Sequence, residues 1–161
     1  MTKKTKTTNI RLTPEWLLAL AREALGGSID IDPCTEPENP TGATIWYTER
    51  EPAPDPWPPG TVWCNPPWGA GEIIRWARKA MTRPHQDPLV FMTPTDSRTE
   101  WFKYLKREAD YLILITRSVR CYAPELEREV EPSRGVYLWT KGVAPEKLAC
   151  FRDAGHVVCR L

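Results

Sequence analysis

The residues whose types and spacing are best suited to catalysis or ligand binding form one short turn. Asn65, Pro66, Pro67 and Trp68 follow directly after the apolar segment 61–64. Because each proline lacks a backbone N–H and fixes φ at about −65°, a strand formed by that segment must end at Asn65, and the chain must turn there. The turn therefore presents one side-chain amide, one backbone carbonyl and one aromatic ring in a stiff arrangement. Such an arrangement suits recognition of a planar ring that carries an amino group.

The chemistry open to this turn follows from the groups it holds. An exocyclic amine such as adenine N6 is a poor nucleophile because its lone pair is delocalised into the ring, and it becomes more reactive when both N–H groups donate to acceptors. The Asn65 side-chain oxygen and the Pro66 carbonyl are the two candidate acceptors, and Trp68 can stack on the ring. Asn65 is neutral and cannot act as a general base, so its help would come from hydrogen bonding and positioning. The alternative is a Pro-Pro pair that only terminates a strand.

The rest of the chain predicts the elements that must hold this turn. Thr13 is expected to cap a helix with Pro14 at its first position and Gly26 after its end. Ser97 and Glu100 predict a capping box for a helix that runs through residue 109. Two further helices are predicted over 70–83 and 145–154. The predicted strands span 28–32, 43–47, 61–64, 88–92, 111–116, 118–122, 135–140 and 156–161.

The order of these elements predicts the fold class. Helices and continuous apolar strands alternate through the middle of the chain, which is typical of a doubly wound, mostly parallel α/β sheet with helices on both faces. The last strands lack long crossovers and are expected to add antiparallel edges. Ligand-binding residues in such a sheet collect at the carboxyl ends of the strands. Asp32, the Asn65 turn and the segment 93–96 all fall there, so we expect them to line one crevice.

Composition narrows the class of protein further. After a flexible basic arm, residues 1–11, we expect residues 12–161 to form a single domain. The net charge of +1 means that affinity for nucleic acid must come from local patches.

The five cysteines include no CxxC pair and follow no apolar leader, which indicates reduced thiols in a cytoplasmic protein. His85 and His156 have no ligand partners at a useful spacing, so no metal site is expected, and no apolar run approaches the length of a membrane span.

Several motifs occur in the order typical of one family. They are Thr13-Pro14, Asp30-Ile31-Asp32-Pro33-Cys34, Asn65-Pro66-Pro67-Trp68, Thr93-Pro94-Thr95-Asp96 with Trp101-Phe102, and Pro132-Ser133-Arg134-Gly135 before a strand. With these motifs the chain resembles, over roughly residues 12–141, the phage-type DNA N6-adenine methyltransferase family, also called Dam-like. The most specific motif is the Asn-Pro-Pro-aromatic turn after a strand.

The resemblance implies a fold and a reaction. The fold would be the Rossmann-like fold of S-adenosylmethionine-dependent methyltransferases, and the reaction would transfer a methyl group to the N6 amine of an adenine flipped out of DNA. The resemblance makes the catalytic turn Asn65, Pro66, Pro67 and Trp68. It also implies that five residues lie beside the cofactor: Thr13, Pro14, Asp32, Pro33 and Cys34. A phage or prophage origin, with methylation that protects against host restriction, follows from the resemblance alone.

One departure from the wider class concerns the cofactor. Methyltransferases usually carry a glycine-rich turn after the first strand, whereas here Asp32 is followed by no glycine until Gly42. An acid after the second strand normally binds the cofactor ribose. Glu49, Glu51 and Asp55 are the candidates, and Asp55 is favoured.

Basic side chains supply the expected DNA contacts. The candidates are Arg75, Arg78, Lys79, Arg117, Arg120 and Arg134. The first three recur at helical spacing after the turn, where they either meet phosphates or form an ordinary solvated face. Arg117 and Arg120 lie near the end of a strand on the crevice edge. Because no separate recognition domain is expected, reading of the DNA sequence would fall to the segment 117–134.

Two other functions are compatible with the same features. Methylation of cytosine N4, of RNA or of a glutamine side chain would need the same kind of Asn-Pro-Pro-aromatic turn. A non-catalytic relative that binds nucleic acid is favoured by the missing glycine turn. Binding of S-adenosylmethionine would distinguish the non-catalytic relative, which is not expected to need it, from both kinds of methyltransferase.

Overall fold

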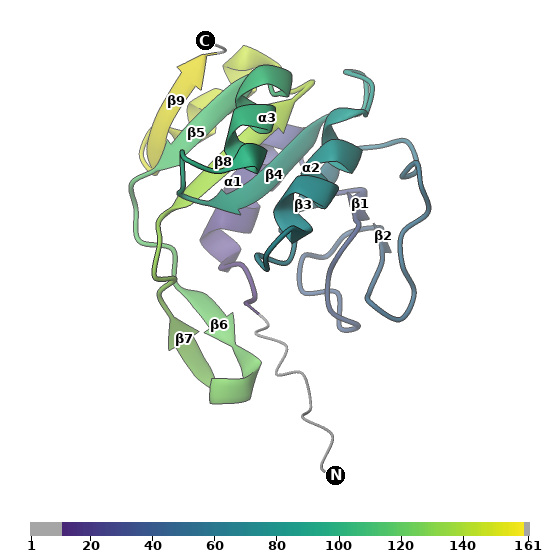
Figure 1. Ribbon diagram of the computed structural model, residues 1–161, viewed down its shortest axis with the longest axis vertical. Coiled ribbons are helices and arrows are strands. Elements are labelled where there is room, and N and C mark those ends of the chain that lie inside the picture. Colours follow the sequence, from purple (N-terminus) through teal and green to yellow (C-terminus); the bar gives the residue numbers. More distant parts are fainter. Residues whose placement is uncertain (1–10, 160–161) are drawn as a thin grey trace.

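The fold is built on a seven-stranded sheet flanked by helices (Figure 1). The computed structural model describes residues 11–159, apart from the side chain of Cys159. Its helices are α1 (Glu15–Leu25), α2 (Glu72–Met81), α3 (Glu100–Glu108) and the 3₁₀ helices η1 (Pro124–Leu126) and η2 (Pro145–Phe151). Its strands are β1 (Ile31–Asp32), β2 (Ile45–Trp46), β3 (Val62–Cys64), β4 (Leu89–Pro94), β5 (Tyr111–Ile115), β6 (Cys121–Ala123), β7 (Arg128–Val130), β8 (Val136–Lys141) and β9 (Gly155–Cys159).

The strand order in the large sheet is β2-β1-β3-β4-β8-β5-β9. Strands β2, β1, β3 and β4 pair in parallel, β8 is antiparallel to both β4 and β5, and β9 is antiparallel to β5. The prediction of a mostly parallel sheet is therefore confirmed. The prediction that the last strands only add edges is wrong for β8. The segment after β5 carries the chain back to β4, so β8 enters the sheet between β4 and β5.

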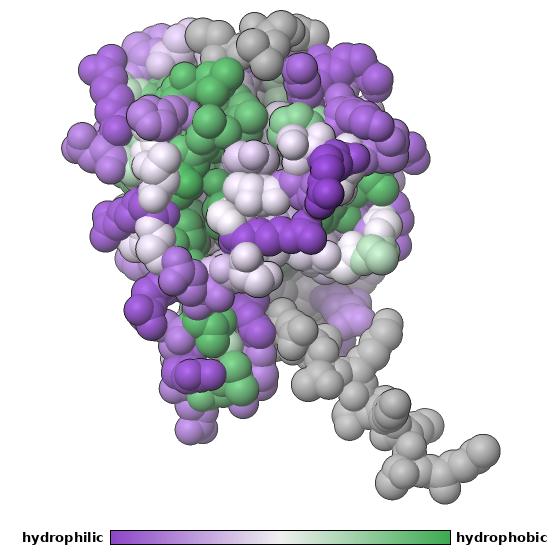
Figure 2. Space-filling model, turned by 60° about the vertical axis from the view of Figure 1, so that its left-hand side comes forward, coloured by the Kyte–Doolittle hydropathy of each residue, from purple (hydrophilic) through white to green (hydrophobic). Residues whose placement is uncertain are grey.

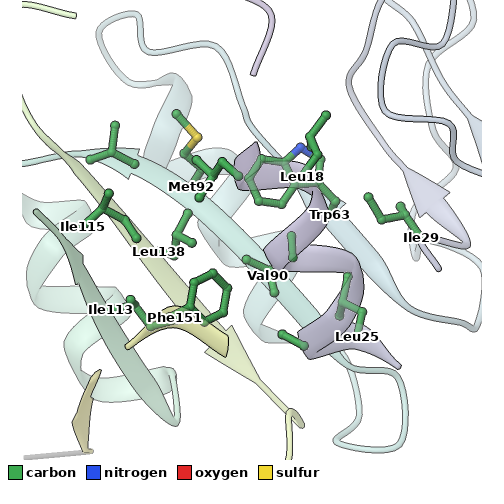
Figure 3. Close-up of a cluster of buried hydrophobic side chains, with 14 of the residues drawn as sticks. Leu18, Leu25, Ile29, Trp63, Val90, Met92, Ile113, Ile115, Leu138 and Phe151 are labelled. Carbon is green, nitrogen blue, oxygen red and sulfur yellow. The ribbon is translucent and has the colours of Figure 1, made fainter. Parts of the chain in front are cut away.

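Side chains from the two faces of the sheet form two separate cores. Trp63 of β3 faces the core beneath α1 and η2, where Phe151 is buried, while its neighbours Val62 and Cys64 face the core beneath α2 and α3. This alternation is the period of two expected of strands buried on both faces. Figure 3 shows the first core, with Leu18 of α1 close to Trp63. Figure 1 shows α2 and α3 in front of the sheet and α1 behind it, so helices cover both faces as predicted.

A hairpin formed by β6 and β7 projects from the body below the sheet (Figure 1). Its apolar side chains lie among hydrophilic ones (Figure 2), and Tyr122 and Leu126 are exposed. Leu12 pairs with Tyr122 through both backbone groups, at 2.9 and 3.1 Å. Arg11 forms an ion pair with Glu125 of the hairpin. The rest of the predicted basic arm, residues 1–10, lies outside the described part of the chain.

Several local predictions need correction. Helix α1 begins one residue later than expected, because Pro14 is extended (φ −66°, ψ 145°) and is itself the N-cap residue. Helix α3 is capped by Thr99, whose hydroxyl accepts from the Phe102 N–H at 3.3 Å, and not by Ser97. A turn in which Asp96 accepts from the backbone two residues ahead delays the start of this helix.

Two elements late in the chain also differ from the prediction. The helix expected over 145–154 is the 3₁₀ helix η2, and the strand expected over 118–122 is the later and shorter β6, which pairs with the unpredicted β7. The predicted last strand corresponds to β9, although its last two residues lie outside the described range.

Candidate active site

The carboxyl ends of β1 and β3 form the switch point of the sheet. From β1 the chain proceeds outward to β2, and β3 then pairs on the other side of β1. Open α/β sheets bind ligands in the crevice at such a point, because the connections leave in opposite directions. Asp32 ends β1 and Cys64 ends β3. The structure therefore brings the Asp-Pro-Cys segment and the Asn65 turn to one crevice edge, as the sequence predicts.

Sulfur contacts join these two segments. Cys34 Sγ lies 3.7 Å from Cys64 Sγ and 3.4 Å from the backbone carbonyl oxygen of Asn65, to which it donates. Burial raises the pKa of the Cys64 thiol well above its ordinary value. Neutral thiols at this position pack the two strand ends together, and they are not suited to act as nucleophiles.

Asp32 supplies a buried negative charge at the crevice. Only 2% of the residue is exposed. Thr41 Oγ1 donates to one carboxylate oxygen at 2.8 Å, and the Cys34 N–H donates to the other at 3.1 Å. Burial raises the pKa of Asp32 to about 6, although these hydrogen bonds oppose the increase. The carboxylate is therefore ionised at neutral pH and fixes the conformation of its own loop.

The loop after β1 uses its backbone donors internally. The Cys34 N–H donates to Asp32, and the Thr35 N–H donates to the Tyr47 carbonyl at 2.8 Å. A glycine-rich turn would instead leave such N–H groups free to bind an anionic group of a ligand. The absence of glycine noted in the sequence therefore has a structural counterpart in these two hydrogen bonds.

The Asn65 turn has one fixed donor and two unpaired acceptors. Asn65 Nδ2 donates to Thr13 Oγ1 at 3.3 Å. Among residues 11–159, no group donates to Asn65 Oδ1 or to the Pro66 carbonyl. Asn65 is half-buried and Pro66 is buried. Two unpaired acceptors on adjacent residues equal in number the two N–H groups of an aromatic amine.

Trp68 is held more tightly than the sequence suggests. Its ring is partly buried and packs against both cores. Its Nε1 is buried and has no hydrogen-bond partner among the residues that the structure describes. Trp57 and Trp76 share this feature, so it does not by itself mark a ligand site.

The carboxyl end of β4 adds a third wall at the same edge. An open depression of about 350 Å³ is lined there by Thr95, Asp96, Ser97, Arg98, Arg134 and Tyr137. Arg134 donates to Asp96 at 2.7 Å, and Asp96 also accepts from the Arg98 N–H at 3.2 Å. Because β4 continues past the end of β3, the depression lies roughly 10 Å beyond the level of Asn65, at about 3.3 Å per residue. Arg134 therefore lies at the same edge of the sheet as the Asn65 turn, but beyond it.

Three residues predicted to bind DNA and one predicted to bind the cofactor lie on or against α2. This helix starts at the crevice edge and runs back toward the start of β4, so Arg78 and Lys79 in its last turn lie toward the opposite edge. Lys79 Nζ lies 3.4 Å from Asp55, so the structure does not bring Asp55 to the crevice either. Arg75 pairs with Glu72 at 3.2 Å in the first half of the helix. The structure thus separates Arg78, Lys79 and Asp55 from the Asn65 turn, whereas Arg75 lies in the half of α2 that is nearer to it.

Arg117 and Arg120 follow β5 on the crevice side. The Arg117 guanidinium stacks on the Trp16 ring at 4.2 Å from its centroid, close to the start of α1. Arg120 lies 3.5 Å from Glu129 of the hairpin. The segment 117–134 carries as many glutamates as arginines. Its hairpin tip is acidic and poorly suited to phosphate.

The comparisons with known proteins agree with this site. The family model for DNA N-6-adenine-methyltransferase (Dam) matches residues 2–133, which include both walls of the switch point. The chain belongs to the Dam family. The resemblance drawn from the sequence motifs is therefore confirmed, and membership implies adenine N6 methylation of DNA as the general activity of this Dam protein. No curated protein and no solved structure matches the chain.

Within residues 11–159, no cluster of three or more His, Cys, Asp or Glu side chains could hold a metal ion. In the described part of the protein, no helix is long and apolar enough to cross a membrane.

Two residues that shape the site were not recognised in their roles from the sequence. Thr41 holds the Asp32 carboxylate, and no sequence motif marks it. Thr13 was expected to cap α1 and to border the cofactor, but its hydroxyl bonds Asn65. The hydrogen bond between Thr13 and Asn65 depends on contacts between distant segments of the chain, which local sequence patterns do not encode.

Proposed function

We propose that this Dam-family protein transfers a methyl group from S-adenosylmethionine to N6 of an adenine that is flipped out of DNA. The observation that carries the proposal is the pair of unpaired acceptors at the switch point, Asn65 Oδ1 and the Pro66 carbonyl. Adenine N6 carries two N–H donors, and each acceptor would take one. An amine inside a duplex cannot reach these atoms, so the base must leave the stack, at a cost of a few kcal/mol.

The protein's part in the reaction is electrostatic. Acceptors that are fixed before the substrate arrives favour the pyramidal, more nucleophilic form of the amine and stabilise the positive charge that develops on it. Asn65 has no basic group, so the amine proton would leave to water or to another acceptor after transfer. Trp68 borders the same crevice, and its partly buried ring would contact the base.

The residues of the switch point fit the charge of the proposed cofactor. S-adenosylmethionine is a sulfonium cation and supplies an electrophilic methyl group. Asp32 is ionised at neutral pH and buried beside the Asn65 turn, so it would favour a cation there. The segment Asp32 to Cys34 would border the cofactor. Because its N–H groups are already bonded, it would act through charge and shape and not through a glycine cradle.

The DNA backbone would meet the same edge of the sheet. Arg117, stacked on Trp16, and Arg134 in the depression after β4 flank the crevice from two sides, and Arg98 is 89% exposed beside Arg134. We propose these three as the phosphate contacts, since Asp96 can neutralise only one of the two arginines beside it. Modification of phage or prophage DNA against restriction is the role we propose for such an activity.

Analysis of the methylated nucleoside tests the proposal. The purified protein is incubated with unmethylated DNA and methyl-labelled S-adenosylmethionine, and the DNA is digested. We expect label in N6-methyl-2′-deoxyadenosine only, and about 10²-fold less or none with the Asn65→Ala variant. Label in N4-methyl-2′-deoxycytidine, in the protein, or in RNA supplied in a parallel incubation would indicate a different amine. No label, together with no thermal stabilisation by S-adenosylmethionine, would indicate a non-catalytic relative.

A further inference from the structure

We propose that Thr13 is a positioning residue that holds the Asn65 carboxamide in its productive orientation. This inference rests on the proposed function and assigns Thr13 a role other than the cofactor contact expected from the sequence. The side chain of Asn65 turns about two torsions, and its amide oxygen and nitrogen are nearly equal in size. Only the orientation with Oδ1 toward the substrate accepts from the amine, because Nδ2 in that place would set donor against donor.

The observed contact anchors the carboxamide in that orientation. Thr13 Oγ1 is the one side-chain partner of the Asn65 carboxamide within residues 11–159, and it accepts from Nδ2 at 3.3 Å. With Nδ2 held there, Oδ1 is left without a protein donor. Because a hydroxyl can also donate, Thr13 restricts where the carboxamide lies, and the N–H groups of the amine favour the orientation with Oδ1 toward them.

The backbone on either side of Thr13 is fixed by hydrogen bonds. On one side, Leu12 exchanges two backbone hydrogen bonds with Tyr122 of the hairpin. On the other side, the Pro14 carbonyl accepts from the N–H groups of Leu17 and Leu18, which anchors the start of α1. Because Pro14 is the N-cap residue, the Thr13 side chain is free of capping and can reach Asn65. A group held this way can orient its partner at little further entropic cost.

Three substitutions at residue 13 test the assignment by kinetics. Thr13→Val keeps the shape but removes the hydroxyl, and we expect it to lower kcat about five- to tenfold, the value of one hydrogen bond. The KM for DNA and the affinity for S-adenosylmethionine should stay within about twofold. Thr13→Ser should restore most of kcat, whereas Thr13→Ala should resemble Thr13→Val. Thr44→Val is the matched control, since Thr44 is exposed and has no side-chain hydrogen bond in the described structure.

A spectroscopic readout separates this inference from the proposed function. In ¹⁵N NMR spectra, the Asn65 side-chain NH₂ resonances should shift and exchange faster with water in Thr13→Val, and should recover in Thr13→Ser. This result is expected whether or not the protein methylates DNA. Unchanged resonances would overturn the inference even if adenine is methylated. A loss of cofactor affinity as large as the loss of kcat would also overturn it, because Thr13 would then be a cofactor residue.

Discussion

At the scale of single residues, the site depends on a neutral acceptor. In the proposed reaction, Asn65 would bring an oxygen without a charge and would accept from an amine without competing for the sulfonium of the cofactor. The nearby negative charge belongs instead to Asp32, which is buried and already hydrogen-bonded. The two proposed functions, attracting a cation and holding an amine, would thus be divided between the ends of β1 and β3.

The first prediction concerns the acceptor atom of Asn65. Asn65→Ala should lower kcat by about 10²-fold or more, because a fixed acceptor for the developing charge is lost. Its affinity for S-adenosylmethionine, measured by calorimetry, should change by no more than a few fold. Asn65→Asp keeps an oxygen in that place and should retain more activity than Asn65→Ala. Equal loss of turnover and cofactor affinity in Asn65→Ala would mean that the residue has a structural role.

The second prediction concerns the proton of Asp32. Folding raises its pKa from 3.8 to about 6, so the folded protein binds this proton more tightly than the unfolded chain does. Its contribution to the free energy of unfolding is therefore full below about pH 4 and is lost as the pH rises through about 6, with a total on the order of 3 kcal/mol. Asp32→Asn lacks this contribution.

Denaturant titrations over that range measure the effect. The free energy of unfolding of the wild type, minus that of Asp32→Asn, should fall as the pH rises from about 4 to about 6. Curves that run parallel over this interval would contradict a raised pKa for Asp32.

At the scale of elements, the loops and helix starts at one edge of the sheet assemble the site. The start of α1, the ends of β1, β3 and β4, and the segment after β5 all meet there. The acidic hairpin is joined to this edge by the Leu12–Tyr122 bridge. Its charge makes it unsuited to grip phosphate, so binding should depend on the arginines at its base.

The third prediction follows from the two arginines after β5. Arg117→Ala should weaken DNA binding at all sequences and reduce the slope of log affinity against log salt by about one. Arg120→Ala is the comparison variant, and it should have a smaller effect because Glu129 already lies 3.5 Å from this guanidinium. Fluorescence anisotropy over a range of salt concentrations measures both slopes. Equal effects of the two variants would argue against a special role for the Arg117–Trp16 stack.

Sequence patterns located the site better than they located the elements around it. The ends of β1 and β3 were predictable because Pro33 and the Pro66-Pro67 pair stop a strand wherever they stand. The insertion of β8 beside β4 was not predictable, because the choice of strand partner depends on the whole sheet. The hydrogen bond from Asn65 to Thr13 joins residues 52 positions apart, so no local motif could reveal it.

At the scale of the molecule, the C-terminal part is integral to the domain. The family match ends at residue 133, yet β8 and β9 lie beyond it, and β8 sits inside the sheet between β4 and β5. Phe151 of η2 is fully buried in the core that also contains Trp63. We therefore expect residues 12–161 to unfold as one unit.

The fourth prediction tests whether the domain unfolds in a single transition. Phe151→Ala should lower the free energy of unfolding by about 3–5 kcal/mol and shift the transitions seen by fluorescence and by circular dichroism together. Leu126→Ala, at an exposed position of the hairpin, should change it by less than about 0.5 kcal/mol. Separate transitions for the two probes in the Phe151→Ala variant would show that the chain contains independent units.

The bridge between Leu12 and Tyr122 bears on the timing of biosynthesis. Residues 12 and 13 are synthesised before Asn65, and the strand that pairs with Leu12 is synthesised after all three. A nascent chain therefore has the Asn-Pro-Pro-Trp turn before it has the support for Thr13. The proposed anchoring of Asn65 would form only once β6 has been made.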